Sequence, residues 1–298
     1  MFIKRLPKFE YHAPTSLAEA LDLLAKYDGK ARVFAGGTDL LVSMKRREIL
    51  PEHLISLKGV AELKGVHHDQ KEGMKIGALV TLGEIEHSRI IQDDFCVLWD
   101  AVYVMASPQI RSLGTIGGNL CSAAPSADTA PPLMVLDASV EIISTQGERK
   151  VSVENFFKGP GESVLNPDEI LTRILIPHPL KKSSGAYFKL MRRAAMDLAQ
   201  VGVAVCLSFD SEKRICRGAK IALGAVASKP IRVSKAEQIL LNKEMSETVG
   251  KEAGKIAAQE ANPRSSIRAS KEYRREMIEV LTKRAVMAAY NRITAHGT

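Results

Sequence analysis

Two short segments, each built around a pair of adjacent glycines, constrain this 298-residue chain more than any other feature. The first pair, Gly36-Gly37, follows the short run 32–35, which we expect to be a strand, and leads into a polar turn that opens a helix. The second pair, Gly117-Gly118, stands between Thr115 and Asn119. Glycine allows positive φ angles and a close approach of the backbone to a ligand. Successive N–H groups at such turns bind anions.

Each segment by itself is as typical of a tight turn as of a ligand site. Together, 81 residues apart, they predict one shared ligand that carries phosphate. Neither segment has the spacing GxGxxG or GxxxxGK(S/T), so the chain supports neither a Rossmann fold nor a P-loop. Asp128 follows the second pair, and it either accepts hydrogen bonds from ligand hydroxyls or a ring N–H, or caps its own loop.

The N-terminal part reads as a small βαβ-like lobe. Apolar residues at helical spacing predict a helix over 14–29, with a capping box made by Ser16 and Glu19 and an end at Gly29. Strands are expected at 32–35 and 54–57. A second lobe follows, with a hairpin over 60–78, helices near 81–87 and 95–105, and strands at 140–144, 150–153 and 170–176. Residues 106–132 are rich in glycine and proline, and we expect a long irregular, functional segment there.

Pro177, Pro179 and the polar stretch 181–184 mark the best domain boundary. Beyond it the pattern predicts strands at 187–190, 201–209 and 220–226, then helices at 233–241, 245–260 and 270–290. The fold class is therefore α+β. We expect a first domain over 1–177, with lobes at about 1–57 and 58–177, and a C-terminal domain of strands followed by helices over 178–298.

Composition narrows the function classes. The charge of +8 comes from 42 basic and 34 acidic residues that are spread along the chain without a nucleic-acid-binding signature. Four cysteines, Cys96, Cys121, Cys206 and Cys216, form no CxxC pair, so we expect reduced thiols and no metal site in this chain. No apolar run is long enough to cross a membrane, and the first residues lack the apolar core of a signal peptide, so the expected compartment is the cytoplasm.

Three segments together resemble one known family. They are AGGTDLL (35–41), SPQIRSLGTIGGNLCSAAPSADTAPPLMVLDA (107–138) and PRSSIRASKEYRREM (263–277). The family is the FAD-binding medium subunit of molybdenum hydroxylases, and the similarity is strongest to the separate FAD subunit of bacterial xanthine dehydrogenase. The resemblance covers nearly the whole chain. It implies a two-lobed FAD-binding domain of the vanillyl-alcohol oxidase type, followed by a C-terminal domain of the carbon monoxide dehydrogenase flavoprotein type.

The resemblance also implies which residues hold the FAD. The first lobe would wrap the pyrophosphate with the backbone of Val33, Phe34, Ala35, Gly36, Gly37, Thr38, Asp39 and Leu40. The second lobe would contribute Thr115, Gly117, Gly118, Asn119, Ser122, Asp128 and Leu171, the last of these near the adenine or the flavin ring. Lys189 would approach the flavin from the C-terminal domain, where a cation stabilises the reduced, anionic ring. Without the resemblance, Lys189 reads as a solvated lysine on a strand.

The implied role is electron transfer without chemistry on an organic substrate, so no catalytic residue is expected. Electrons would enter from a 2Fe-2S small subunit and leave to a terminal acceptor, for which NAD, oxygen, a quinone and ferredoxin remain open. A molybdenum cofactor on a large subunit would oxidise the substrate. This chain lacks the cysteine-bearing insertion of relatives with an extra cluster, and its histidines lie outside the glycine segments, so the FAD is expected to be non-covalent.

Three alternatives stay open at this point. A stand-alone flavin oxidoreductase of the same fold would reduce its flavin with its own small substrate. A basic binding module would use the glycines only as turns and would hold no flavin. A degenerate subunit would keep the fold and have lost FAD.

Overall fold

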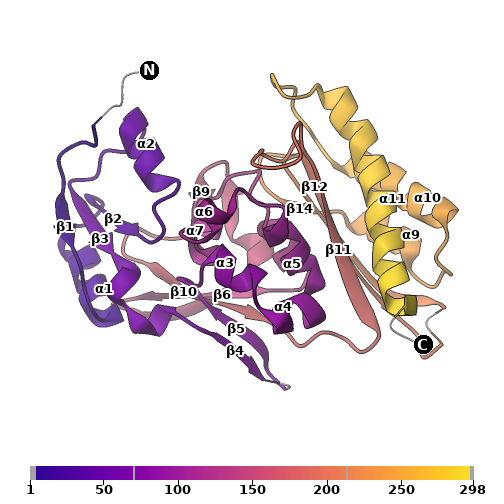
Figure 1. Cartoon of the computed structure of the whole chain (residues 1–298), viewed down its shortest axis with the longest axis horizontal. Helices are drawn as coiled ribbons and strands as arrows, with labels where there is room; N and C mark the ends of the chain where they lie inside the picture. Colours follow the sequence, from indigo (N-terminus) through magenta and orange to yellow (C-terminus); the bar gives the residue numbers. More distant parts are fainter. Residues whose placement is uncertain (1–4, 70, 213, 296–298) are drawn as a thin grey trace.

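The computed structural model describes residues 5–69, 71–212 and 214–295. Three sheets follow one another along the long axis of the molecule (Figure 1). A small N-terminal sheet stands at one end, a five-stranded sheet with covering helices occupies the middle, and a four-stranded sheet backed by helices forms the other end. Among the described helices, none has both the length and the apolar character that a membrane span requires.

The N-terminal sheet is parallel, with strand order β1-β3-β2. Its elements are β1 (Glu10–His12), α1 (Leu17–Lys26), β2 (Ala31–Phe34), α2 (Leu40–Arg46) and β3 (His53–Ser56). Helix α1 buries Ala20, Leu21 and Leu24, which lie on one face because of the 3.6-residue period. The sequence pattern did not predict β1, which is only three residues long.

The predicted capping box of α1 is only half present. The hydroxyl of Ser16 accepts a hydrogen bond from the Glu19 N–H at 3.2 Å, as expected of an N-cap. The Glu19 carboxylate, however, accepts from the Thr15 N–H at 2.9 Å instead of closing onto Ser16. The helix also ends at Lys26, ahead of Gly29, which adopts a φ of 72° in the following turn.

The middle sheet is antiparallel, with strand order β4-β5-β10-β6-β7. Its strands are β4 (Val66–Asp69), β5 (Gly73–Gly77), β6 (Ser139–Ser144), β7 (Gly147–Ser152) and β10 (Ile170–Ile176), and a separate hairpin joins β8 (Phe157–Gly159) to β9 (Glu162–Ser163). Helices α3 (Leu82–Glu86), α4 (Arg89–Asp94) and α5 (Cys96–Tyr103) lie between β5 and β6 in the chain. They share one apolar core with the sheet.

The prediction of an irregular segment over 106–132 was correct only in part. The segment contains α6 (Pro108–Arg111), α7 (Ile116–Cys121) and the start of α8 (Ala130–Val135). Prolines are compatible with these helices because they occupy first-turn positions, where the missing N–H costs no hydrogen bond. Each helix is too short to show apolar periodicity, which is why the sequence pattern missed it.

The C-terminal sheet has the order β11-β12-β13-β14, and its strands are antiparallel. The strands are β11 (Ser183–Leu190), β12 (Val201–Phe209), β13 (Cys216–Gly224) and β14 (Ile231–Arg232), and the helices that follow are α9 (Ser234–Leu240), α10 (Glu247–Glu260) and α11 (Lys271–Ala295). The order of strands first and helices last is the one that the sequence predicts. Strand β11 begins at Ser183, inside the polar stretch that we expected to be a linker.

Both faces of this C-terminal sheet are buried. Side chains alternate between the two faces of a strand, so Val203 and Val205 join the core beneath α10 and α11, whereas Ala204 joins the core of the middle sheet. Helix α5 packs on the second face (Figure 1), and so does helix α8. A bidentate ion pair between Arg292 of α11 and Asp100 of α5, with N–O distances of 2.7 and 2.9 Å, adds a polar connection.

Candidate cofactor-binding site

A cavity of about 840 Å³ collects side chains from all three parts of the fold. This volume lies within the range of ligand and cofactor sites. Of the residues that the sequence singled out, all except Phe34 line it, and they come from both glycine segments, from β10 and from β11. The Phe34 ring instead packs beneath the first loop, where a Cβ on Gly37 would approach its Cε2 atom to 2.3 Å.

The first glycine segment offers unpaired backbone donors. Gly37 adopts a φ of 76°, which turns the chain after β2 and lets it enter α2. Within the described residues, the N–H groups of residues 36–39 have no hydrogen-bond partner, whereas the N–H of Leu41 already bonds to the Gly37 carbonyl at 3.2 Å. Successive free N–H groups of this kind attract an anion.

The second glycine segment is arranged differently from our expectation, and the prediction of a backbone nest there was wrong. The N–H of Ile116 bonds to the Val80 carbonyl and that of Gly117 to the Ala78 carbonyl, each at 3.0 Å. The N–H of Gly118 bonds to the hydroxyl of Thr115, the N-cap of α7, at 3.0 Å. The protein thus satisfies the first N–H groups of this helix itself.

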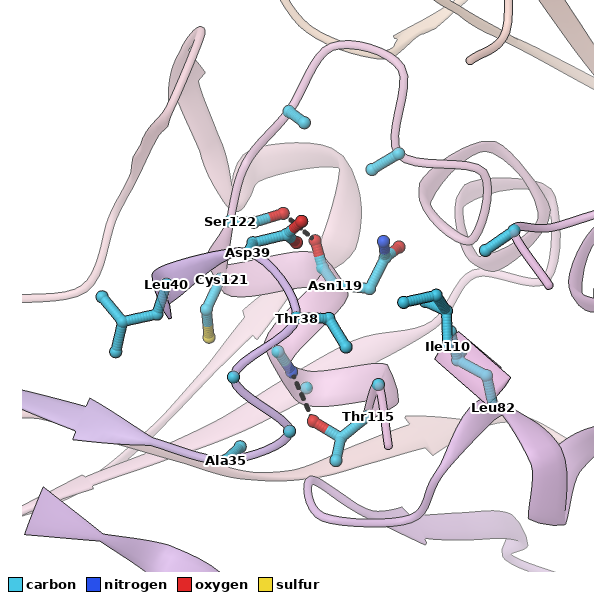
Figure 2. A pocket seen from close by; sticks show the side chains of 18 of the residues that line it. Ala35, Thr38, Asp39, Leu40, Leu82, Ile110, Thr115, Asn119, Cys121 and Ser122 are labelled. Carbon is cyan, nitrogen blue, oxygen red and sulfur yellow. Dashed lines mark hydrogen bonds between the residues drawn. The ribbon is translucent and has the colours of Figure 1, made fainter. Parts of the chain in front are cut away.

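Helix α7 contributes side-chain donors to the cavity. The Asn119 carboxamide oxygen accepts a hydrogen bond from the Thr129 hydroxyl at 2.6 Å, so its amide N–H groups remain as donors. Ser122 donates to the Asn119 carbonyl at 2.8 Å and lies on the next turn. Figure 2 shows this helix facing the loop that carries Ala35, Thr38 and Asp39. The site therefore combines main-chain donors from one lobe with side-chain donors from the other.

The first segment packs against the residues that precede the second segment, and the second segment packs against the chain directly after β5. A Cβ on Gly36 would come within 2.1 Å of the Leu113 carbonyl oxygen, just before the second segment, and one on Gly117 would meet Ala78 at 2.7 Å. At Gly118 an added Cβ would meet only the Thr115 hydroxyl, at 2.9 Å. At positions 36 and 117, glycine is required because neighbouring parts of the chain pack too closely for a side chain. Only at Gly118 does a bound ligand remain as the reason for the absence of a side chain.

Asp128 and Lys189 are paired in the wall of the cavity. Lys189 Nζ lies 2.8 Å from Asp128 Oδ2, and the Tyr187 hydroxyl donates to Oδ1 at 2.8 Å. The side chains of Lys189 and Asp128 are only 2% and 6% exposed. Burial raises the pKa of Asp128, and the Lys189 ammonium and the Tyr187 hydroxyl oppose that rise. Burial and the Asp128 carboxylate also raise the pKa of Tyr187 well above its ordinary value, so the phenol stays protonated and donates.

Several apolar side chains complete the cavity without any signal in the sequence. They are Leu79, Leu82, Met105, Ile110, Leu165 and Leu198. Cys121 also lines it, and burial raises the pKa of its thiol to about 12, so the sulfur stays protonated and acts as part of an apolar wall. Together with Leu171, these residues supply the apolar surface that a flat ring requires.

Arg111, in the segment 107–138 that resembles the family, supports the site without lining it. Its guanidinium makes two hydrogen bonds to the Glu86 carboxylate, at 2.7 and 2.8 Å, and a third to the Met105 carbonyl at 2.6 Å. The arginine side chain is 8% exposed. These hydrogen bonds connect Arg111, in α6, to α3 and to the turn before α6. They fix the position of the segment that precedes the second glycine pair. Arg111 therefore stabilises the structure around the cavity and does not contact a ligand in it.

Comparisons with known proteins agree with this architecture. Residues 7–179 match the family model described as the FAD binding domain in molybdopterin dehydrogenase, and residues 186–289 match the CO dehydrogenase flavoprotein C-terminal domain. The chain is 35% identical to the putative xanthine dehydrogenase FAD-binding subunit of Escherichia coli K12 over 94% of this chain and 95% of that one. It is 33% identical to the carbon monoxide dehydrogenase medium chain of Afipia carboxidovorans, over 94% and 96% of the two chains.

Solved structures give the same result. A chain of carbon monoxide dehydrogenase from Hydrogenophaga pseudoflava superposes with a TM-score of 0.92 at 32% identity, covering 97% of this chain and 99% of that one. A chain of quinoline 2-oxidoreductase from Pseudomonas putida 86 gives a TM-score of 0.91 at 30% identity, with coverage of 97% and 99%. This chain belongs to the family of FAD-binding medium subunits of molybdenum hydroxylases.

Proposed function

We propose that the cavity holds FAD without a covalent bond and that the chain works as the electron-transfer subunit of a molybdenum hydroxylase complex. The observation that carries the proposal is that the N–H groups of residues 36–39 have no partner in the part of the chain that the structure describes and lie across one cavity from the side-chain donors of α7. Such an arrangement suits a diphosphate held between two lobes. The family supports the choice of FAD.

The predicted contact residues divide into three roles. The loop of residues 33–40 would bind the pyrophosphate through its backbone, and Thr115, Asn119 and Ser122 would add hydrogen bonds from α7. Leu171 would pack against a ring. Lys189, held by Asp128, would keep a positive charge at the cavity wall and so favour the reduced form of the cofactor. Bound FAD would supply the ability to accept single electrons and to release them in pairs.

The partners that we propose are a small subunit with 2Fe-2S clusters, which delivers the electrons, and a large subunit with the molybdenum cofactor, which oxidises the organic substrate. The relatives support this assignment, because they include a medium chain of carbon monoxide dehydrogenase and a subunit of a 6-hydroxypseudooxynicotine dehydrogenase complex. NAD is one candidate for the terminal acceptor. We place the complex in the cytoplasm.

The test is to purify the chain with its partners and separately without them, and to supply FAD to both. We expect both preparations to carry flavin, and expect small organic substrates to bleach the flavin only in the complete complex. A chemical one-electron donor should reduce the flavin in the isolated chain as well. Reduction of the isolated chain by an organic substrate would instead establish a stand-alone flavin oxidoreductase. Absence of flavin from the complete complex would contradict the cofactor assignment.

A further inference from the structure

We propose that Glu10, His12 and His53 form a binding site for one divalent transition-metal ion and that zinc is the preferred ion. The three side chains lie on the N-terminal sheet, at the end of the molecule where β1 forms its edge (Figure 1). None of them lines the cofactor cavity. The site is therefore separate from the proposed FAD site.

The sheet register brings the three residues together. Strand β1 pairs with β3 in parallel, so that Glu10 stands beside His53, and His12 follows on the same face of β1 two residues later. His53 is 41 residues from His12 in the chain, a spacing that no short metal-binding motif covers. For this reason our expectation from the sequence was that the chain holds no metal site, and the present proposal departs from it.

The distances suit a tetrahedral ion. His12 Nε2 lies 3.2 Å from His53 Nδ1, and Glu10 Oε2 lies 3.3 Å from the same Nδ1 and 4.0 Å from His12 Nε2. Ligands at about 2.0–2.1 Å from zinc in a tetrahedron are about 3.3 Å apart, so two of the three edges match. The third edge shortens if the exposed Glu10 carboxylate moves by a fraction of an ångström.

Hydrogen bonding alone leaves this cluster poorly matched. His53 Nδ1 faces both His12 Nε2 and the Glu10 carboxylate, and a single proton on it would have to be shared between the two. A cation at the centre would satisfy the lone pairs of both nitrogens and of the carboxylate at once. The imidazoles are 19% and 13% exposed, so the site is partly desolvated.

The ring of His53 is held in position by its surroundings. Tyr27, which follows α1, stacks on it with ring centroids 3.6 Å apart and an interplanar angle of 15°. Two imidazoles and one carboxylate are ligands that zinc and its neighbours prefer, whereas magnesium and calcium select oxygen ligands. Three protein ligands leave a fourth position for water. The ion would tie the three-residue strand β1 to β3.

The experiment uses the full chain, stripped of metal with a chelator and then dialysed against zinc sulfate, with bound metal measured by mass spectrometry. We expect one zinc ion per chain and no displacement of it by magnesium. His12→Ala and Glu10→Gln should each weaken zinc binding, with a loss of about tenfold or more for the histidine variant. Both sites are near the surface, so the fold should persist, and unchanged circular dichroism would show this. His87→Gln, at an exposed histidine outside the cluster, is the matched control and should bind zinc normally.

A second readout follows the strand itself. Zinc should slow amide hydrogen exchange at residues 10–12 in the parent chain, and it should leave exchange at residues 36–39 unchanged. Failure of the parent chain to bind zinc would overturn the proposal, as would equal zinc binding by the parent and His12→Ala. Loss of zinc from the His87→Gln variant would also overturn it, because the ion would then lie elsewhere.

Discussion

Lys189 and Asp128 form a buried pair whose partners depend on each other. Removing only one member leaves an unpaired charge on a side chain that is almost completely buried, and such changes typically cost about 3–5 kcal/mol of stability. Removing both charges costs much less. The sequence indicated both residues as cofactor contacts, but their pairing with each other and with Tyr187 required the fold, because Asp128 lies 59 and 61 residues from its partners.

We therefore predict that Lys189→Met lowers the free energy of unfolding by about 3 kcal/mol near neutral pH. Loss of the ammonium raises the pKa of folded Asp128 further above its unfolded value. Folding then favours the protonated carboxyl. The contribution of Asp128 to the stability of the variant is therefore greatest at low pH and falls as the pH rises through the folded pKa. Urea unfolding of the parent and the variant over a pH series measures this, and the deficit should shrink towards acid.

The double variant Asp128→Asn/Lys189→Met is the control for this pair. It carries no buried charge, so it should recover most of the lost stability and should remove the added dependence on pH. A single Lys189→Met variant as stable as the parent at every pH would contradict the buried pair.

Gly118 gives a second prediction at the scale of one residue. Gly118 lines the cavity and an added Cβ would meet only the Thr115 hydroxyl, so Gly118→Val should weaken FAD binding by about tenfold or more, equivalent to about 1.4 kcal/mol. The measurement is a flavin titration of the cofactor-free chain. Gly250→Ala in α10 is the control, because its Cβ would have no neighbour closer than 3.5 Å, and it should bind FAD normally. FAD affinity equal to that of the parent in Gly118→Val would remove Gly118 from the site.

Gly37 is a poorer choice for the same test. Its positive φ and the Phe34 ring beneath it mean that any side chain strains the loop itself. Loss of flavin from a Gly37 variant would therefore not distinguish a blocked phosphate from a distorted loop. The sequence predicted the glycine correctly as a turn residue, but only the structure shows which neighbour requires it.

At the scale of elements, the segment that carries α6 and α7 depends on Arg111. Arg111→Met would leave the Glu86 carboxylate and the Met105 carbonyl without their donor, so we predict a loss of about 3 kcal/mol in urea unfolding. FAD affinity should fall too, although Arg111 does not line the cavity. The matched control is Arg173→Met, which breaks an exposed pair with Glu141 and should cost less than about 1 kcal/mol. Equal costs for the two variants would contradict the structural role of Arg111.

Elements that have strong local patterns were predicted well. Strand β10 was predicted to within its observed bounds, and β2, β3, β12 and the helices of the C-terminal part within a few residues. The elements that were not predicted are β1, α4, α6, α7, α8, β8, β9 and β14, which are short and gain their stability from tertiary packing. The hydrogen bonds of the first N–H groups of α7 were not predicted for a similar reason. Their partners Ala78 and Val80 lie almost 40 residues earlier in the chain.

On the scale of the whole molecule, the C-terminal sheet is part of the core of the middle sheet. Tyr187, Ala204 and Ala222 belong to that core, and Lys189 completes the cavity. We therefore predict that a fragment of residues 1–179 exposes an apolar surface and fails to retain FAD. Dye binding and flavin titration measure both effects, and adding a fragment of residues 180–298 should restore flavin binding. A soluble 1–179 fragment with the FAD affinity of the full chain would show that the two domains function independently.

The resemblance of a few motifs to a family predicted the overall class of fold and many of the cavity-lining residues, because two of the three motifs, at 35–41 and 107–138, contribute to the cavity wall. Spacing and periodicity alone did not predict how the lobes touch, since the contact of Gly36 with Leu113 depends on packing over 77 residues of chain. The domain boundaries that we expect from the prolines at 177 and 179 remain a prediction.

In the proposed complex with FAD, one lobe binds the diphosphate through its backbone and the other through its side chains. Residue-resolved amide hydrogen exchange with and without FAD distinguishes the two lobes. We predict strong added protection of the N–H groups at residues 36–39, which have no partner among the described residues, and little change at residues 116–118, which the protein already satisfies. Unchanged exchange at residues 36–39 in a chain saturated with FAD would show that the backbone of the first lobe does not bind the diphosphate.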